Sequence, residues 1–526
     1  MRKAAALGLL FLCTAAAQEI AGLDAYVRHE MEDKHLPGLS IALVDDQRVI
    51  LQRNFGDAGD GTVYRIGALD SAKPLTIGDA ARQLRGLCGG LGSAPGLPAA
   101  PGVAPGSSGF AKVLPKEKVG AVTAATTDGA QGVIANIAGQ ALIHLVAARL
   151  NRPAPPFPIT EPIPAAEARG LAGHYAGFDL IERAGELYVL RRDGGWRLRV
   201  RRRGGELIVD DRMAFGDKVA EGAKVVPKLA SNPFPGLVGE YGPDAHEIYI
   251  LERYGQLNAL IDRYYYPLRR ISGDVFQFAE GSLYYGGKKV TFTPDAVVVG
   301  TDTFQRRPTG PGKDGIYRIQ PLRPVAELRR EALKMRPPQE KGEFRASDLV
   351  DLTAIDPSIK LDIRYATADN FLSTPVYPKA RAMMQRPAAE ALARASHKLH
   401  AQGFGLLIHD AYRPWYVSRI FWDATQGDQH NFVADPSQGS RHNRGCAVDL
   451  TMFDLKTGRA VEMTGAYDEM SERSYPDYPG GTSLAREHRE ILRRAMEEEG
   501  FAVYETEWWH FDYRTWREYP ILNQDF

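Results

Sequence analysis

The feature that most constrains the fold is a pair of separated segments that carry metal-binding side chains. Residues 440–449 have the sequence Ser-Arg-His-Asn-Arg-Gly-Cys-Ala-Val-Asp, and residues 507–510 are Glu-Trp-Trp-His. His442, Asp449 and His510 supply two imidazoles and one carboxylate, and three such ligands with an open fourth position are typical of a catalytic zinc ion. The fold must therefore bring the end of the chain back onto residues 440–449.

Glu507 is a carboxylate beside this ligand set, and such a group commonly serves as general base for a metal-activated water. The run 447–452 predicts a strand entered through Gly445, with Asp449 on the strand and His442 in the preceding loop. Glu507 and His510 are three positions apart, so a regular strand would point them to opposite faces. Both can reach one ion only if the chain bends at the two tryptophans between them.

These motifs resemble the signature of the zinc D-alanyl-D-alanine dipeptidases. The pattern Ser-x-His-x-x-Gly-x-Ala-x-Asp is matched at every fixed position, and Glu-Trp-Trp-His follows it. The resemblance extends over Tyr365-Ala366-Thr367, Asn370-Phe371 and Asp410-Ala411-Tyr412-Arg413-Pro414 to about residue 520. It covers roughly the last third of the chain and implies one zinc ion, held by His442, Asp449 and His510.

The resemblance also implies roles for other residues. Glu507 would take a proton from the zinc-activated water and return it to the leaving amine, while Arg413 would stabilise the oxyanion, which suits a permanently charged planar donor. Tyr365, Ser440 and Asp468 would help to hold the two ends of a small dipeptide.

Two of these assignments leave alternatives open. Glu469 or Glu472 could take the part of Asp468, and Ser440 could be only a loop or cap residue. Cys446, His409 and His430 are not predicted as ligands. Cys446 occupies a variable position of the pattern, and the two histidines have no motif partner.

Three functions are compatible with the motifs. The first is an exported D-alanyl-D-alanine dipeptidase, and the second is a zinc peptidase that trims the D,D- or L,D-linked end of peptidoglycan stem peptides. The third is a wall-binding module with a silent metal site. Glu507 and Arg413 argue against the third, because a binding module needs neither a base nor an oxyanion donor.

Length and charge limit the other possibilities. At 526 residues the chain should hold more than one domain. Lys+Arg and Asp+Glu are both 65, which argues against nucleic acid or an anionic membrane as the main partner. The sequence leaves the oligomeric state open.

The first residues predict a secretory signal peptide. Met1-Arg2-Lys3 precedes an apolar run and the small residues Ala15-Ala16-Ala17, so cleavage is expected before Gln18 and the protein is expected to be exported, to the periplasm. Cys13 follows a large residue, which makes lipid attachment less favourable than plain export. No other apolar run approaches membrane-spanning length, so no transmembrane segment is expected after signal removal.

Residues 18–155 resemble a shortened serine β-lactamase-like hydrolase or penicillin-binding protein. Such enzymes need Ser-x-x-Lys, but Asp70 stands three residues before Lys73 and Ser71 only two before it. Residues 89–109 are rich in Gly, Pro, Ala and Ser and predict a linker. Residues 109–150 resemble the closing strands and final helix of that family. We expect this part to lack serine chemistry.

Residues 160–305 contain an internal repeat. Leu171-Ala172-Gly173-His174-Tyr175 recurs as Leu237-Val238-Gly239-Glu240-Tyr241, and Glu186-Leu187-Tyr188-Val189-Leu190 recurs as Glu247-Ile248-Tyr249-Ile250-Leu251. Both copies are rich in β-branched and aromatic residues, which predicts two similar β-units packed together.

The pattern of the whole chain predicts a multidomain α+β protein. The last domain is expected to have helices near 387–402, 415–425 and 484–499 packed on a small antiparallel sheet. The predicted parts are a signal peptide (1–17), a truncated β-lactamase-like α/β domain (18–155), a β-rich repeat unit (160–305), a Pro-rich connector with one helix near 326–334 (306–342) and a zinc dipeptidase domain (343–526).

Overall fold

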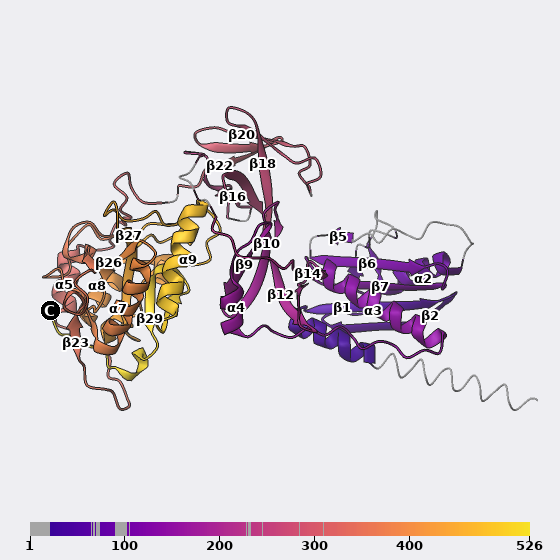
Figure 1. Ribbon diagram of the computed structural model, residues 1–526, viewed down its shortest axis with the longest axis horizontal. Helices are drawn as coiled ribbons and strands as arrows, with labels where there is room; N and C mark the ends of the chain where they lie inside the picture. The colour runs from indigo at the N-terminus through magenta and orange to yellow at the C-terminus, as the bar shows by residue number, and fades with distance from the viewer. Residues whose placement is uncertain are drawn as a thin grey trace, which may run out of the picture. The chain divides into compact units, whose positions relative to one another are not determined.

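The computed structural model describes residues 22–64, 66, 69, 74–89, 102–104, 106–227, 229, 233–244, 246–282, 284–308 and 310–526 (Figure 1). The predicted signal peptide, Asp70, Ser71, Lys73 and most of the predicted 89–109 linker lie outside these residues. The chain forms two compact units that divide between Val226 and Pro227. This division falls within the range predicted to hold the β-repeat.

The first unit begins with a five-stranded sheet in the order β2-β1-β7-β6-β5, and its paired strands are all antiparallel. Helix α3 and a helix over residues 22–33 bury apolar side chains against one face, and α2 covers the other. The elements are β1 (Gly38–Asp45), β2 (Arg48–Gly56), β3 (Val63–Tyr64), β4 (Leu75–Thr76), α2 (Ile77–Gly89), β5 (Gly102–Ala104), β6 (Ser107–Leu114), β7 (Val119–Ala125) and α3 (Gln131–Arg149).

Strand β1 shows why helices cover both faces. Leu39, Ile41 and Leu43 belong to the core beneath α3, whereas Ala42 and Val44 belong to the core beneath α2. This is the two-residue alternation of a strand that is buried on both sides. The closing strands and helix predicted over 109–150 are present as β6, β7 and α3. The resemblance to β-lactamase-like enzymes stays a prediction, because the residues that would carry serine chemistry are not among those described.

Helix α3 differs from expectation in one respect. Among the described residues, it is long and apolar enough to cross a membrane by length and composition alone. From the sequence, no such run is expected beyond the signal peptide. In the structure Val133, Ile134 and Ile137 of this helix are buried in the core of the first sheet. The apolar composition of α3 therefore has an explanation in packing.

The first copy of the repeat forms a six-stranded sheet in the order β14-β13-β12-β10-β9-β8. It follows α4 (Ala165–Leu171) and comprises β8 (Gly173–His174), β9 (Phe178–Arg183), β10 (Glu186–Arg191), β12 (Leu198–Arg203), β13 (Glu206–Asp210) and β14 (Phe215–Lys218), with β11 (Gly195–Trp196) in the β10–β12 connection.

The second copy opens the second unit as a meander in which consecutive strands β15 to β22 are neighbours. These are β15 (Gly239–Tyr241), β16 (Ile248–Arg253), β17 (Gln256–Ile261), β18 (Tyr264–Ser272), β19 (Val275–Phe278), β20 (Lys289–Phe292), β21 (Ala296–Val299) and β22 (Asp302–Gln305).

The repeat itself is present. Tyr175 donates its hydroxyl to the carbonyl of Leu171 at 2.8 Å, and Tyr241 donates to Leu237 at the same distance. The second predicted alignment was wrong by one strand. It matched residues 186–190 on β10 with residues 248–251 on β16, but β16 corresponds to β9, and β10 corresponds to β17.

The hairpin turns establish the correct alignment. Glu182 accepts the backbone N–H of Gly185 after β9, and Glu252 accepts that of Gly255 after β16. Both turns place two residues at positive φ, which suits the right-handed twist of the paired strands. The error arose because β10 and β16 have similar apolar patterns.

The C-terminal sheet has five strands in the order β24-β26-β27-β29-β28. They are β24 (Lys360–Leu361), β26 (Phe404–Asp410), β27 (Ala447–Asp454), β28 (Phe501–Tyr504) and β29 (Glu507–Tyr513). The expectation of a purely antiparallel sheet was wrong for one pair, since β24 runs parallel to β26. The connection between these two strands contains a helix, and such a crossover permits parallel pairing.

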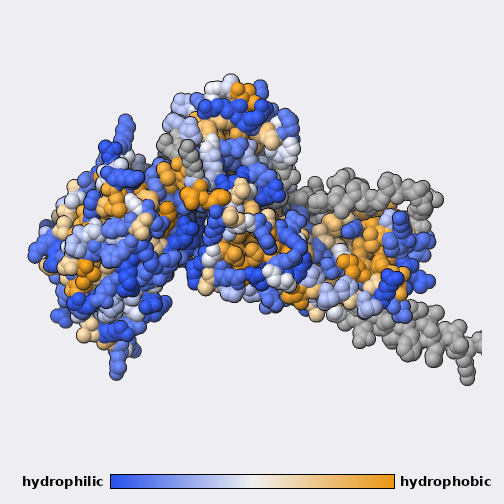
Figure 2. Space-filling view, viewed as in Figure 1, coloured by the Kyte–Doolittle hydropathy of each residue, from blue (hydrophilic) through white to orange (hydrophobic). Residues whose placement is uncertain are grey.

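The predicted helices are found within two residues of their expected bounds, as α7 (Arg386–His400), α8 (Trp415–Ala424) and α9 (Ser483–Glu497). Helix α7 starts with Pro at its first turn, as expected. The remaining elements are β23 (Leu349–Asp351), α6 (Leu352–Ile355), β25 (Met383–Gln385) and the 3₁₀ turns η1 (Arg364–Ala366), η2 (Gly427–Phe432), η3 (His442–Arg444), η4 (Glu472–Ser474) and η5 (Trp516–Glu518). Hydrophilic residues cover much of this part in the view of Figure 2, while its apolar side chains form one large core.

The predicted connector contributes to this core. Helix α5 (Val325–Ala332) buries Val325 and Leu328 in it, and the backbone N–H of Ile319 donates to Phe371 at 2.9 Å. Glu340 accepts Arg444 at 2.5 Å and the N–H of Ile521 at 2.6 Å. A domain boundary at residue 343 would therefore remove part of the folded unit.

We expect residues 343–526 expressed alone to be less stable than residues 313–526. Loss of a buried leucine side chain costs about 2–5 kcal/mol, and the shorter fragment loses Leu328 with the rest of α5. Urea unfolding of the two fragments measures the difference. Equal free energies of unfolding would show that α5 and Glu340 contribute nothing to the domain.

Candidate active site

Three neighbouring strands of the C-terminal sheet bring the candidate residues together. Asp449 on β27 lies directly opposite His510 on β29, and on its other side it pairs with Asp410 at the end of β26. Directly opposed residues of an antiparallel pair have their Cβ atoms about 4.5–5.5 Å apart. The strand register therefore places two of the three predicted ligands side by side.

His442 reaches the same point from the turn η3, just before β27. Gly445 ends this turn with φ at 69°, and a Cβ atom there would lie 2.5 Å from the side chain of Leu349. Both the backbone conformation and the lack of space require glycine. The glycine of the motif thus allows the sharp turn that carries His442 into the site.

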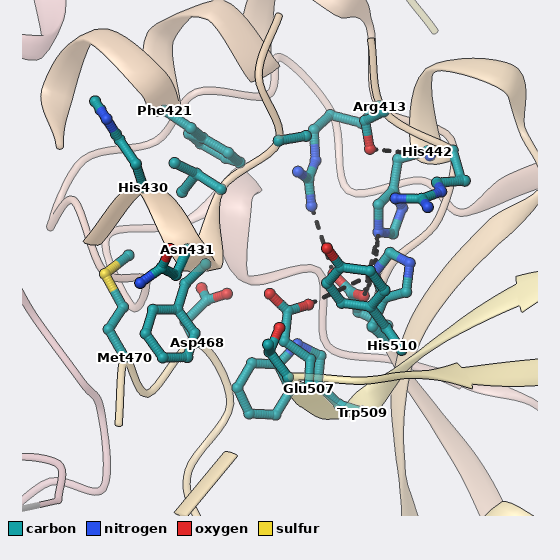
Figure 3. Close-up of a pocket in the computed structure, with 18 of the residues that line it drawn as sticks. Arg413, Phe421, His430, Asn431, His442, Asp468, Met470, Glu507, Trp509 and His510 are labelled. Atoms are coloured by element: carbon teal, nitrogen blue, oxygen red, sulfur yellow. Dashed lines mark hydrogen bonds and ion pairs between the residues drawn. The ribbon is translucent and has the colours of Figure 1, made fainter. Parts of the chain in front are cut away.

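The three predicted ligand atoms form a tight triangle (Figure 3). Nε2 of His442 lies 3.2 Å from Oδ1 of Asp449 and 3.1 Å from Nδ1 of His510, and that Nδ1 lies 3.1 Å from Oδ1 of Asp449. The three residues are buried, with exposed fractions of 1%, 2% and 7% for His442, Asp449 and His510. Of the described residues, these three form the cluster that could hold a metal ion.

The second nitrogen of each histidine has its own partner. Nδ1 of His442 lies 2.6 Å from the carbonyl oxygen of Ala411, and Nε2 of His510 lies 3.0 Å from Oδ1 of Asp512. Since each of these oxygens accepts an N–H, the other nitrogen of a neutral ring presents a lone pair to the centre of the triangle. Two imidazole lone pairs and a carboxylate oxygen then converge, which is the donor set of a cation site.

Charge in the site supports the same conclusion. Although burial opposes ionisation, His442 and His510 hold the pKa of Asp449 well below its usual range. Burial disfavours a charged imidazole, yet Asp512 and Asp449 raise the pKa of His510 to about 10. The surroundings therefore favour positive charge at this point, and zinc fits both the ligand types and the charge.

Glu507 lies beside the triangle. Its Oε2 is 3.6 Å from Nδ1 of His510, and its side chain is 12% exposed. The pairing of β28 with β29 shifts between Val503, which faces Phe511, and Tyr504, which faces Glu507. The expected bend is thus an irregularity in the pairing of β28 with β29, whose register passes from Phe511 to Glu507 without Trp508, Trp509 or His510. It allows side chains three positions apart to reach one point.

The protonation of Glu507 suits proton transfer. Burial raises the pKa of Glu507 to about 7, against the lowering effect of His510. A carboxyl group with a pKa near 7 can both accept and return a proton at neutral pH.

Arg413 is held rigidly just after β26. Its Nε donates to Asp410 at 2.8 Å and its Nη2 to Asp449 at 3.4 Å, while Tyr377 donates its hydroxyl to Asp410 at 2.7 Å. The guanidinium also lies 4.8 Å from the ring centre of Phe421. Figure 3 shows it pointing towards the triangle from the side opposite Glu507.

The predicted substrate-contacting residues line the same cavity, which has a volume of about 460 Å³. Tyr365 donates its hydroxyl to Oδ1 of Asp468 at 2.8 Å, whereas Oδ2 of Asp468 is buried without a hydrogen-bond partner. Ser440 accepts the backbone N–H of His442 at 3.2 Å, a hydrogen bond between the loop and the first residue of η3, so it has the loop role that the sequence left open. It also lines the cavity.

The two alternatives to Asp468 are engaged elsewhere. Glu469 accepts the N–H of Ala466 and the hydroxyl of Ser471, at 2.9 and 2.7 Å. Glu472 accepts the hydroxyl of Tyr249 at 2.5 Å. Asp468 is therefore the acid of this segment that retains an unpaired oxygen in the site.

The three residues not predicted as ligands do not belong to the cluster of His442, Asp449 and His510. Cys446 is buried, and burial raises the pKa of its thiol to about 12. His409 stacks on Tyr467, and His430 stacks on Trp422 at 3.8 Å between ring centres.

The sequence interpretation missed several supporting residues. Asp512 orients His510, Asp410 and Tyr377 hold Arg413, and Tyr467 donates its hydroxyl to Asp449 at 3.2 Å. Asp512 could have been found, because it lies two positions after His510 and so shares its face of the strand. Asp410 lies in the same segment as Arg413, three residues before it, and Tyr467 directly precedes Asp468, whereas Tyr377 comes from a separate segment. No local pattern assigns these contacts to the three residues.

Comparison with known proteins identifies the family. A family model described as D-ala-D-ala dipeptidase matches residues 345–520. The D-alanyl-D-alanine dipeptidase of Escherichia coli (strain K12) is 36% identical over 180 residues, which are 34% of this chain and 92% of the relative. Those of Enterococcus faecium and Streptomyces coelicolor are 34% and 33% identical, and the matches cover 33% and 31% of this chain and 95% and 93% of the relatives. Because the matched region contains the metal motif and these relatives are covered almost completely, this chain belongs, through its C-terminal part, to the D-alanyl-D-alanine dipeptidase family.

Proposed function

We propose that the C-terminal part of this chain hydrolyses D-alanyl-D-alanine to two molecules of D-alanine. The observation that carries this proposal is the convergence of His442, Asp449 and His510 within 3.2 Å, beside Glu507 and Arg413. Membership of the dipeptidase family supports the choice of substrate. A silent binding module would have no use for the base and the buried guanidinium.

His442, Asp449 and His510 would hold one zinc ion. When bound, zinc supplies Lewis acidity towards a water molecule and a peptide carbonyl. Glu507 takes the proton of the attacking water and later gives it to the leaving amine, as its pKa of about 7 allows. Arg413 donates to the oxygen on which negative charge develops, and Asp410 keeps the guanidinium in place.

Asp468 is the proposed partner of the substrate ammonium group. Its Oδ2 is buried without a partner, and burial together with the nearby charge of Asp449 raises its pKa well above the usual range. A cationic amine placed beside this carboxyl would offset both effects. Tyr365 fixes the other oxygen of Asp468, and Ser440 holds the loop that carries His442.

The extent of the cavity is a reason to consider a second class of substrate. It extends beyond the metal triangle to His430, Asn431 and Met470 (Figure 3). This space could receive a peptide longer than two residues, such as the D,D- or L,D-linked end of a peptidoglycan stem peptide.

Zinc-loaded protein should be incubated separately with D-alanyl-D-alanine and with a stem pentapeptide, and released D-alanine measured. Rapid release from the dipeptide alone is the expected result. Release only from the pentapeptide would replace the dipeptidase proposal with that of a stem-peptide peptidase. No release from either would favour the binding module.

The proposed site of action is the periplasm. This proposal rests on the basic start, apolar run and small residues of the predicted signal. N-terminal sequencing of protein recovered from the periplasm should give Gln18 as the first residue. Recovery of the full-length chain in the cytoplasm would contradict it.

A further inference from the structure

One wall of the cavity is an irregular segment between β27 and α9, residues 464–482, here called the pocket loop. Asp468, Glu469, Met470 and Tyr475 of this loop line the cavity. It contains η4 and otherwise has no regular secondary structure. The loop carries the carboxylate proposed to receive the substrate amine, so its position bears directly on substrate binding.

The conformation of the loop around Asp468 requires support. Asp468 has φ at 61°, in the left-handed region that a non-glycine residue rarely adopts. Strained backbone of this kind persists only where the surroundings determine it. Inside the loop, Glu469 accepts Ala466 and Ser471, and Ser474 donates its hydroxyl to the carbonyl of Glu469.

The remaining support comes from the β15–β22 sheet, at two tyrosines. Tyr478 of the pocket loop donates its hydroxyl to Glu240 on β15, and both side chains are buried. The hydroxyl of Tyr249 on β16 lies 2.5 Å from Oε2 of Glu472 in the loop and 2.6 Å from Oε2 of Glu247, just before β16, so both carboxylates share this hydroxyl. Burial and the neighbouring carboxylates raise the pKa of both tyrosines, so each hydroxyl stays protonated and can donate.

A second set of bonds fixes the end of the loop where α9 begins. Glu252 of β16 accepts the backbone N–H of Ser483 at 2.7 Å, and its own N–H donates to Gly481 at 3.1 Å. Arg486 donates to the carbonyl of Glu252 at 2.6 Å. In the first copy, Glu182 accepts the corresponding turn N–H at Gly185. In the second copy, the equivalent carboxylate of Glu252 also accepts the N–H of Ser483, at the start of α9.

This sheet is an addition to the family framework. It lies before residue 345, where the match to the family model starts. The relatives from E. coli and E. faecium are matched over 92% and 95% of their own length, which leaves too few residues for an eight-strand meander. The loop of this chain therefore has a neighbour that those proteins lack.

We propose that the β15–β22 sheet is a positioning element of the active site: by holding the pocket loop, it keeps Asp468 in place to receive the amino end of the dipeptide. This inference rests on the proposed function. It assigns Tyr249, Tyr478 and Glu240 a role in substrate affinity, although none of them lines the cavity. The zinc triangle and Glu507 lie on β27, η3 and β29, so the role should affect binding more than the chemical step.

The test compares the full-length parent with the double variant Tyr249→Phe/Tyr478→Phe, both loaded with zinc. The variant keeps both rings but removes the hydroxyl of Tyr478 that donates to Glu240 and the hydroxyl of Tyr249 that Glu472 and Glu247 share. A hydrogen bond to a charged group stabilises a structure, so losing these bonds should weaken the hold on the loop. We expect KM for D-alanyl-D-alanine to rise roughly three- to tenfold. We expect kcat to stay within about twofold of the parent value, because the proton-transfer groups are untouched. Zinc content should not change.

Tyr241→Phe is the matched control. It removes a buried hydroxyl of the same sheet that donates to Leu237 and accepts from Arg306, neither of which belongs to the pocket loop. It should lower thermal stability while leaving KM unchanged. An equal rise of KM in the control, or no rise in the double variant, would overturn the proposal and leave the sheet a purely structural role.

Amide hydrogen exchange of residues 464–482 gives a readout that does not depend on activity. Faster exchange in the double variant than in Tyr241→Phe supports the coupling, and equal exchange contradicts it. If the parent does not cleave the dipeptide, the proposed function fails, but the exchange comparison still decides whether the sheet holds the loop.

Discussion

Glu507→Ala should retain zinc and lose kcat by about 10²–10⁴-fold, the usual size of general acid–base assistance. The three proposed ligands remain, but the attacking water loses its proton acceptor. Metal content by atomic absorption and steady-state hydrolysis of D-alanyl-D-alanine are the two measurements. Near-parent turnover with normal zinc would mean that the base lies elsewhere. Asp468 and Glu505, which both line the cavity, are the next candidates.

His510→Ala is the matched comparison. It removes a proposed ligand that lies within 3.1 Å of both His442 and Asp449, so zinc and activity should be lost together. The contrast between the two variants separates a catalytic carboxylate from a ligand. Loss of zinc in both would show that Glu507 is itself a ligand.

Arg413→Lys should lower kcat by about 10²–10³-fold with zinc retained, the effect typical of removing an oxyanion donor. Lysine keeps the positive charge but has no planar fork to contact Asp410 and Asp449 together. Retaining the charge also avoids leaving the buried Asp410 unpaired, so the folded state should survive. Steady-state kinetics with the dipeptide measures the effect.

Arg419→Lys on α8 is the control for this substitution. Arg419 pairs with Asp423 at 2.7 Å and does not line the cavity. Its activity should equal that of the parent. If the two lysine variants have similar activity, Arg413 has no role in stabilising the oxyanion.

Much of the site could be predicted because its chemistry lies in short segments. His442, Gly445 and Asp449 fall within one ten-residue stretch, and Glu507 and His510 within four residues. Their residue types indicate a metal and a base whatever surrounds them. The helices α7 and α9 were predictable for a similar reason, since their apolar periodicity and end signals are local.

Side-chain direction could not be predicted for acids that are close in sequence. Asp468, Glu469 and Glu472 are equivalent by type, but one faces the cavity, one bonds within the loop and one meets Tyr249. Asp468 also has a positive φ, and no sequence pattern in the segment indicates it.

The repeat shows the same limit on a larger scale. The two tyrosine motifs identify two copies correctly, yet the next strand was misaligned because β10 and β16 share an apolar pattern. Strand pairing depends on which side chains are buried across the whole sheet, so local similarity does not determine register.

By itself, the sequence predicted the candidate ligands, a candidate base and a candidate oxyanion donor and indicated a β-repeat, because each is a property of residues close together in the chain. Only the tertiary structure decided that Asp449 pairs with His510, that the pairing of β28 with β29 shifts between Val503 and Tyr504, and that β16 contacts the pocket loop. These features join segments far apart in sequence. Their geometry is set by the burial of a shared core and by long-range hydrogen bonds, which no local pattern contains.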